Sequence, residues 1–86
     1  MNDEIRNLSE RLRSNPGDVD AWLDRAEAYR QAGDFDQAIS DCNEAYRLGP
    51  EDAWRVFTCR GLAYEGKGDY EQAVSDLSEA LRLRPG

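Results

Sequence analysis

One segment of the sequence, residues 61–68, comes closest to a catalytic motif and reads GLAYEGKG. It nearly matches the phosphate-binding pattern G-x-x-x-x-G-K-[ST], in which backbone N–H groups and a lysine hold phosphate oxygens. Gly68 stands where a serine or threonine would bind magnesium, and Asp69 adds negative charge beside it. A phosphate-binding loop follows an apolar strand, and no such strand precedes Gly61. We therefore interpret the segment as a glycine-rich turn between two helices, and we expect no nucleotide or other cofactor.

Pairs of carboxylates are the second feature that could do chemistry, either by holding a metal ion or by acid–base catalysis. They occur as Asp18-Val19-Asp20, Asp34-Phe35-Asp36 and Glu51-Asp52. Each pair falls where a helix is expected to begin, and the positive end of a helix dipole favours anions there by about 0.3–1 kcal/mol. We interpret these carboxylates as helix caps, and we expect no metal site.

The two cysteines, Cys42 and Cys59, are seventeen residues apart, and the chain has no histidine. A structural zinc site needs four ligands, which two thiols cannot supply without histidine. The absence of histidine also removes the commonest general base and the Ser–His and Cys–His nucleophile pairs. The first four residues are acidic rather than apolar, so we expect no signal peptide, reduced thiols and a cytoplasmic location. The sequence predicts a protein that is not an enzyme.

The composition bounds the fold and the partners. The 86 residues are enough for one small domain, and no apolar run reaches the length of a membrane span. Eighteen acidic residues against eleven basic ones give a net charge of −7, which disfavours nucleic acid and anionic lipid as partners. A basic or amphipathic protein partner remains compatible with this charge.

An internal repeat organises the chain. Residues 33–50 read GDFDQAISDCNEAYRLGP and residues 68–85 read GDYEQAVSDLSEALRLRP, so that eleven of the eighteen positions are identical. Upstream, Trp22, Ala26 and Tyr29 recur thirty-five residues later as Phe57, Gly61 and Tyr64. Apolar residues at i, i+4 and i+7, capping aspartates and the stop signals of Gly33, Pro50 and Pro85 predict pairs of helices. We expect five helices, over residues 3–14, 19–32, 35–48, 52–66 and 69–83.

The pattern Trp22…Ala26…Tyr29…Gly33…Phe35…Ala38…Ala45…Pro50 resembles a tetratricopeptide repeat, and Phe57…Gly61…Tyr64…Gly68…Tyr70…Ala73…Ala80…Pro85 resembles a second one. The offset of thirty-five residues exceeds the family period of thirty-four by one, which places an extra residue near Pro50–Ala53. The resemblance implies an all-α, right-handed solenoid of helical hairpins, formed by about five antiparallel helices. We expect a single domain, residues 1–86, with a capping helix in 1–16 and repeats in 19–52 and 53–86.

The resemblance also implies a function, because such repeats bind protein segments in the concave surface lined by the first helix of each unit. The residues expected to line this groove are Asp20, Leu23, Asp24, Glu27, Arg30, Arg55, Thr58, Cys59, Leu62 and Glu65. The acidic rim and apolar floor suit a peptide with apolar anchors beside lysine or arginine. Co-chaperone members of the family hold the terminal carboxylate of a ligand with lysine, arginine and asparagine. The equivalent positions here hold Leu23, Glu27 and Cys59, with only Arg55 of a suitable type, so we expect no such carboxylate clamp. Trp54 has no counterpart in the first repeat, and it either covers the lengthened loop or anchors a ligand.

The two ends of the chain differ. In the first helix, polar residues back a narrow stripe of Ile5, Leu8 and Leu12, as the terminal unit of a solenoid requires. The last helix instead keeps the apolar stripe of an internal helix, with Val74, Leu77 and Leu81. We expect these three residues to mediate self-association as a homodimer. The alternatives to a peptide-binding module are a self-associating structural or engineered building block and an RNA-binding pentatricopeptide-like pair, against which the net charge argues.

Overall fold

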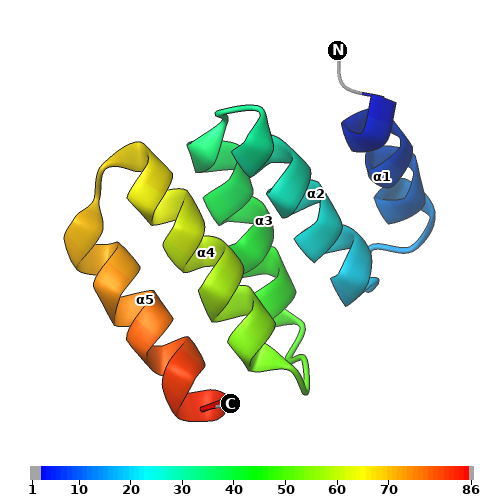
Figure 1. Cartoon of the computed structure of the whole chain (residues 1–86). Helices are drawn as coiled ribbons and strands as arrows, with labels where there is room; N and C mark the ends of the chain where they lie inside the picture. Colours follow the sequence, from blue (N-terminus) through cyan, green and yellow to red (C-terminus); the bar gives the residue numbers. More distant parts are fainter. Residues whose placement is uncertain (1–2, 86) are drawn as a thin grey trace.

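The computed structural model describes residues 3–85, which form five α-helices joined by short turns (Figure 1). The helices are α1 (Asp3–Ser14), α2 (Val19–Gln31), α3 (Phe35–Arg47), α4 (Ala53–Lys67) and α5 (Tyr70–Leu83). No strand occurs within residues 3–85, so the all-α expectation is confirmed. Each boundary lies within one residue of the expected one. The first two residues of the expected capping helix lie outside the described part.

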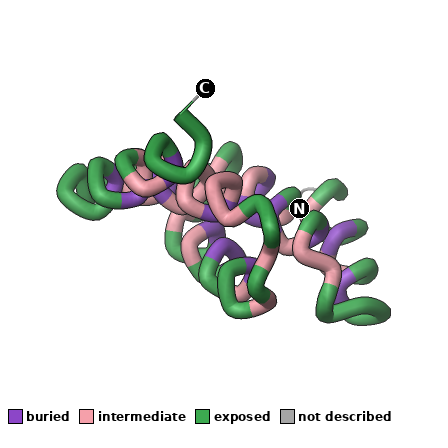
Figure 2. The backbone as a smooth tube through the Cα atoms, turned by 90° about the horizontal axis from the view of Figure 1, so that it is seen from below, coloured by how far each residue is buried: buried purple, intermediate pink, exposed green. Residues whose placement is uncertain are grey.

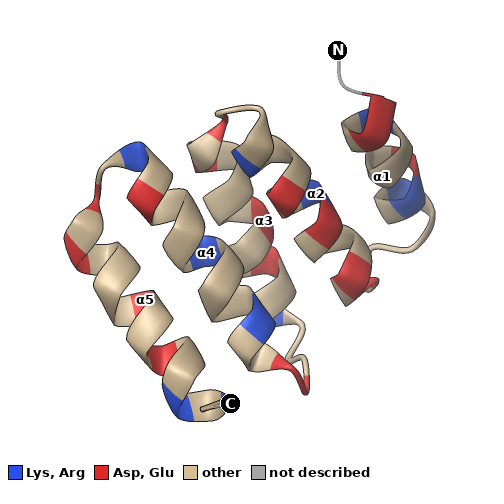
Figure 3. Cartoon of the chain, viewed as in Figure 1, with Lys and Arg blue, Asp and Glu red and all other residues tan. Residues whose placement is uncertain are grey.

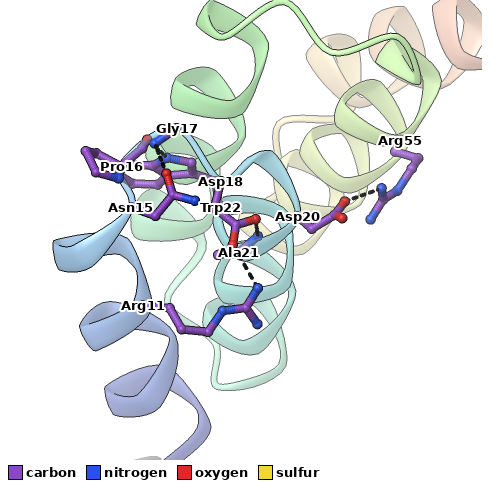
Figure 4. Close-up of polar contacts among 9 residues, drawn as sticks. All are labelled: Arg11, Asn15, Pro16, Gly17, Asp18, Asp20, Ala21, Trp22 and Arg55. Carbon is purple, nitrogen blue, oxygen red and sulfur yellow. Dashed lines mark hydrogen bonds and ion pairs between the residues drawn. The ribbon is translucent and has the colours of Figure 1, made fainter.

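Aspartate side chains cap three of the helices. Asp18 accepts a hydrogen bond from the backbone N–H of Ala21 at 3.0 Å, as Figure 4 shows. Asp34 and Asp69 cap α3 and α5 in the same way, accepting from backbone N–H groups three residues on, at 3.4 and 3.3 Å. These bonds satisfy donors that the first helical turn leaves unpaired. The capping interpretation is wrong in one detail, because Asp52 stands at the N-cap of α4 without a side-chain capping bond.

Most of the segment at residues 61–68 is helical, as the helix expected over 52–66 implies, and it is not the glycine-rich turn that its glycines indicated. It forms the last two turns of α4, and only Gly68, with a φ of +92°, lies in the turn. Gly61 is buried against α5, where an added Cβ would lie 2.9 Å from Cγ of Leu77. The glycine at position 61 therefore serves the close approach of two helices rather than a change of chain direction.

The helices pack as two hairpins, α2 with α3 and α4 with α5, while α1 covers α2 and α4 packs against both α2 and α3. Figure 2 shows the buried positions along the inward sides of these helices. The main cluster is rich in small side chains, which let helices approach closely, and consists of Leu23, Ala26, Ala38, Cys42, Ala45, Val56 and Ala63. A second cluster joins Leu8 and Leu12 of α1 to Ala21. Trp22 packs against both clusters, and its indole N–H donates to the carbonyl oxygen of Pro16 at 2.8 Å.

Candidate peptide-binding groove

A hollow of about 270 Å³ lies between α2 and α4, the first helices of the two hairpins. It is open to solvent, and its walls are formed by Leu23, Asp24, Glu27, Trp54, Arg55, Thr58, Cys59 and Leu62. The lining residues of α2 are spaced i, i+1 and i+4, and three lining residues of α4, Thr58, Cys59 and Leu62, have the same spacing. Residues at this spacing share one face of a helix, so the two helices turn equivalent faces toward the hollow. The structure brings most of the expected groove residues together around this one hollow.

Three expected groove residues lie beside the hollow rather than in its wall. The carboxylate of Asp20 accepts a hydrogen bond from the guanidinium group of Arg55 at 2.7 Å, which joins α2 to α4 (Figure 4). Arg30 forms an ion pair with Glu27 one turn before it on the same helix. Glu65 is exposed near the end of α4 and does not line the hollow between α2 and α4.

The charge of the groove comes mainly from α2, along which acidic positions recur in Figure 3. The ion pairs of Asp20 with Arg55 and of Glu27 with Arg30 neutralise two of its carboxylates. Asp24 is exposed and has no ion-pair or hydrogen-bond partner within residues 3–85. It faces both this hollow and a larger one of about 640 Å³ between α1 and α2, which Glu27 also lines. The unpaired carboxylate therefore stands on the ridge between two hollows.

The floor of the groove combines apolar side chains with a pair of thiols. Leu23 is 5% exposed, and Leu62 and Cys59 are half-buried. Cys59 packs against the cluster that contains the fully buried Cys42 of α3, and both cysteines are free. The neighbouring Cys59 raises the pKa of Cys42, as does burial, and the neighbouring Cys42 lowers the pKa of Cys59. Cys59 is thus the more acidic thiol and the one that borders solvent.

Trp54 belongs to two sites at once. It forms part of the wall between α2 and α4, and it also lines a hollow of about 510 Å³ beside α5. The guanidinium carbon of Arg84 lies 4.4 Å from the centre of its ring, which fits a cation–π contact. The sequence indicates Trp54 as a possible ligand anchor but does not assign it to the groove. The first repeat has no counterpart of Trp54 from which the side of the helix that it occupies could be inferred.

The groove presents one unpaired carboxylate beside an apolar floor, and no group of three or more metal-ligating side chains occurs among the described residues. No helix within residues 3–85 is both long and apolar enough to cross a membrane.

Family models described as tetratricopeptide repeats match residues 5–53 and 54–86. The chain belongs to the tetratricopeptide repeat family. Its hairpins and their stacking fit the solenoid of this family, and the expectation drawn from the repeated motif is confirmed. Tetratricopeptide repeats mediate protein–protein interactions and are typically non-catalytic modules. A comparison with curated proteins gives no match.

Proposed function

We propose that this tetratricopeptide chain is a non-catalytic module that binds a peptide segment of a partner protein in the groove between α2 and α4. The observation that carries the proposal is the position of Asp24, unpaired and exposed at the edge of a hollow whose floor is apolar. A ligand with one or two apolar anchors next to lysine or arginine matches both features. The proposed module is one domain, residues 1–86, with a capping helix in 1–16 and repeats in 19–52 and 53–86. Two free thiols support a cytoplasmic location.

The two parts of the groove contribute differently to binding. Burying one leucine side chain of the ligand against Leu23 and Leu62 contributes about 1.5–3 kcal/mol, which supplies affinity. The carboxylates at the rim remain in contact with water, so they act mainly on the rate of association and on the choice of partner. An acidic peptide is repelled by the same rim.

The proposal is tested with short fluorescein-labelled peptides in fluorescence-polarisation titrations. The first peptide carries two leucines and two lysines among glycines and serines, the second replaces its lysines by glutamates, and the third replaces its leucines by alanines. Binding of the first peptide alone supports a groove that needs both the charge and the apolar anchors. Equal binding of all three peptides contradicts it.

Charge reversal then places the binding site. Asp24→Lys and Glu27→Lys are expected to slow the association of the lysine peptide and to weaken its dependence on salt. Glu44→Lys is the matched control, because Glu44 pairs with Arg47 on α3 just as Glu27 pairs with Arg30 on α2. If neither groove substitution changes the affinity, or if the control lowers it equally, the peptide binds outside the groove between α2 and α4. Titration with mixed single-stranded RNA tests the RNA-binding alternative in the same assay.

Self-association is a second candidate function, through Val74, Leu77 and Leu81, and it corresponds to a structural building block. The observation that favours it is the exposure of α5, where the side chains of Val74 and Leu81 are 64% and 66% exposed. Leu77 differs from the expected open stripe, since it is half-buried in the space that the missing side chain of Gly61 leaves. Sedimentation equilibrium over a range of concentrations tests this function independently of peptide binding.

A further inference from the structure

Helices α1 and α3 occupy equivalent positions, and each packs against the next helix through the same side. We call this side the flank. On α1, the hydroxyl oxygen of Ser9 accepts a hydrogen bond from Arg25 of α2 at 3.0 Å. On α3, the equivalent Asn43 accepts from Arg60 of α4 at 2.9 Å. The flank is therefore an interface on both α1 and α3.

On α5 the same flank is open. Ser78 occupies the position of Ser9 and Asn43 and is exposed, and it has no hydrogen-bond partner within residues 3–85. Tyr70, Val74 and Leu81 are each more than 60% exposed along this flank. Beside them lies the hollow of about 510 Å³, which has Leu77, Ala80 and Leu81 in its wall. This surface is separate from the proposed groove, with which it shares only Trp54 and Thr58.

We propose that a second copy of this chain covers the open flank, with the two α5 helices packed antiparallel about a two-fold axis at Leu77. The proposal rests on the self-association described above and specifies its geometry. The residues along the flank follow i, i+4, i+7 and i+11 spacing on α5, and they are Tyr70, Val74, Leu77 and Leu81. A two-fold axis requires the same patch on both copies, and this stripe pairs with itself when one copy is reversed.

The reversed pairing matches side chains of suitable type at each level. Val74 of one copy meets Leu81 of the other on both sides of the axis, and the half-buried Leu77 lies at the axis between them. The small side chain of Ser78 lies beside the axis, where it lets the two helices approach closely.

The charges on α5 favour the antiparallel direction. Acidic residues, Asp69 and Glu71, stand at its beginning, and basic residues, Arg82 and Arg84, stand at its end. A parallel pair would bring like charges together, whereas the reversed pair places Glu71 of each copy beside Arg82 of the other. Because the patch is small and the pair is exposed, the dimer belongs to the weak class of interfaces. We expect it to form at roughly micromolar concentrations and above.

Sedimentation equilibrium of the full chain, from micromolar to millimolar concentration, tests whether the chain dimerises through the open flank of α5. The wild type is expected to change from monomer to dimer, and Leu81→Glu is expected to stay monomeric with an unchanged melting temperature at low concentration. Leu83→Glu is the matched control, because Leu83 is also an exposed leucine of α5 but lies on its other side, and it should leave the dimer intact. A monomeric wild type, or a dimer that Leu81→Glu leaves unaltered, overturns the proposal.

Exchange of two charges on α5 tests whether the two α5 helices pack antiparallel. Glu71→Arg and Arg82→Glu are each expected to weaken the dimer about threefold to tenfold, and the double variant is expected to restore it, since opposite charges then face each other again. A dimer that Leu81→Glu dissociates, but that the double variant fails to restore, overturns the antiparallel register while leaving self-association in place.

Thiol cross-linking gives a second readout of the same axis. Ser78→Cys is expected to form a covalent dimer when oxidised glutathione is added. Ser75→Cys, exposed on another side of α5, is expected to remain monomeric. Both variants contain the native Cys42 and Cys59, so these thiols affect both equally. A chain that stays monomeric yet binds a peptide of residues 53–67, the sequence of α4, would instead identify a helix of the α4 type as the occupant and overturn the proposal.

Discussion

The guanidinium group of Arg25 on α2 donates to both carboxylate oxygens of Asp41 on α3, each at 2.8 Å. The pair recurs one unit later, where Arg60 on α4 holds Asp76 on α5 with the same two distances. The aspartate side chains are only 3% and 6% exposed, so both pairs are buried at the crossing of a helical hairpin. Each arginine also reaches the preceding helix and thereby ties three helices together.

Removal of one partner from this pair is expected to cost far more than removal of a surface charge. Asp41→Ala leaves Arg25 largely buried without its counter-ion, which should lower the free energy of unfolding by about 3–5 kcal/mol. Asp36→Ala is the matched control, because Asp36 pairs with Lys67 at 2.6 Å, yet both side chains are exposed. The control should cost less than about 1 kcal/mol. Urea denaturation measures both, and equal losses would contradict the assignment.

The small residues at the helix crossings are expected to tolerate no added volume. Ala38 is fully buried and Ala73 is 4% exposed, so Ala38→Leu and Ala73→Leu should each destabilise the fold by about 1–3 kcal/mol through overpacking. In a domain of this size, each kcal/mol corresponds to a fall of about 4–8 °C in the melting temperature. Gln37→Leu, at an exposed neighbouring position, is the control. Thermal melts followed by circular dichroism that show no change in either alanine variant would contradict the packing.

The helices were predictable because their signals are local. Asp18, Asp34 and Asp69 cap the helices that the repeated pattern indicated, and Gly33 and Gly68 adopt the left-handed conformation that ends them. The buried ion pairs were not predicted, although arginine and aspartate recur sixteen residues apart in both units. Charged residues on a helix usually face water, and only the crossing of two helices determines which ones turn inward.

The groove was predictable where one helix face determines it. Leu23, Asp24 and Glu27 follow the period of α2, so their common face could be inferred from spacing alone. The contributions of Trp54 and of α1 depend on how neighbouring helices pack, which spacing does not specify. The segment ending at Gly68 was misinterpreted for the same reason, since the need for a glycine at position 61 arises from α5.

Asp18 is expected to make the stability of the domain sensitive to acid. The backbone N–H of Ala21 and the guanidinium group of Arg11 hold the pKa of Asp18 below its usual value. The stabilisation is therefore fully present above about pH 4 and is lost as the pH falls through the lowered folded-state pKa. Asp18→Ala should cost about 1 kcal/mol at pH 7 and less at pH 2. Melts at both pH values measure this, and a difference that does not change with pH would contradict it.

The two thiols beneath the groove are expected to differ in reactivity. Cys59 is half-buried and its pKa is lowered by the neighbouring thiol of Cys42, which is itself wholly buried. Because the thiolate is the reactive form, iodoacetamide should alkylate Cys59 well before Cys42, as mass spectrometry of the digested protein would show.

Loss of the Cys42 thiol should change the reactivity of Cys59 in a defined direction. Cys42→Ala removes the neighbouring thiol that lowers the pKa of Cys59, so this pKa rises and the pH–rate profile for alkylation moves to higher pH. A profile that stays in place in a folded variant would show that Cys42 does not stabilise the thiolate. Since Cys59 lines the hollow between α2 and α4, the lysine- and leucine-containing peptide should also slow its alkylation. The peptide in which alanines replace the leucines should give no protection, because without apolar anchors it does not occupy the floor where the thiol lies.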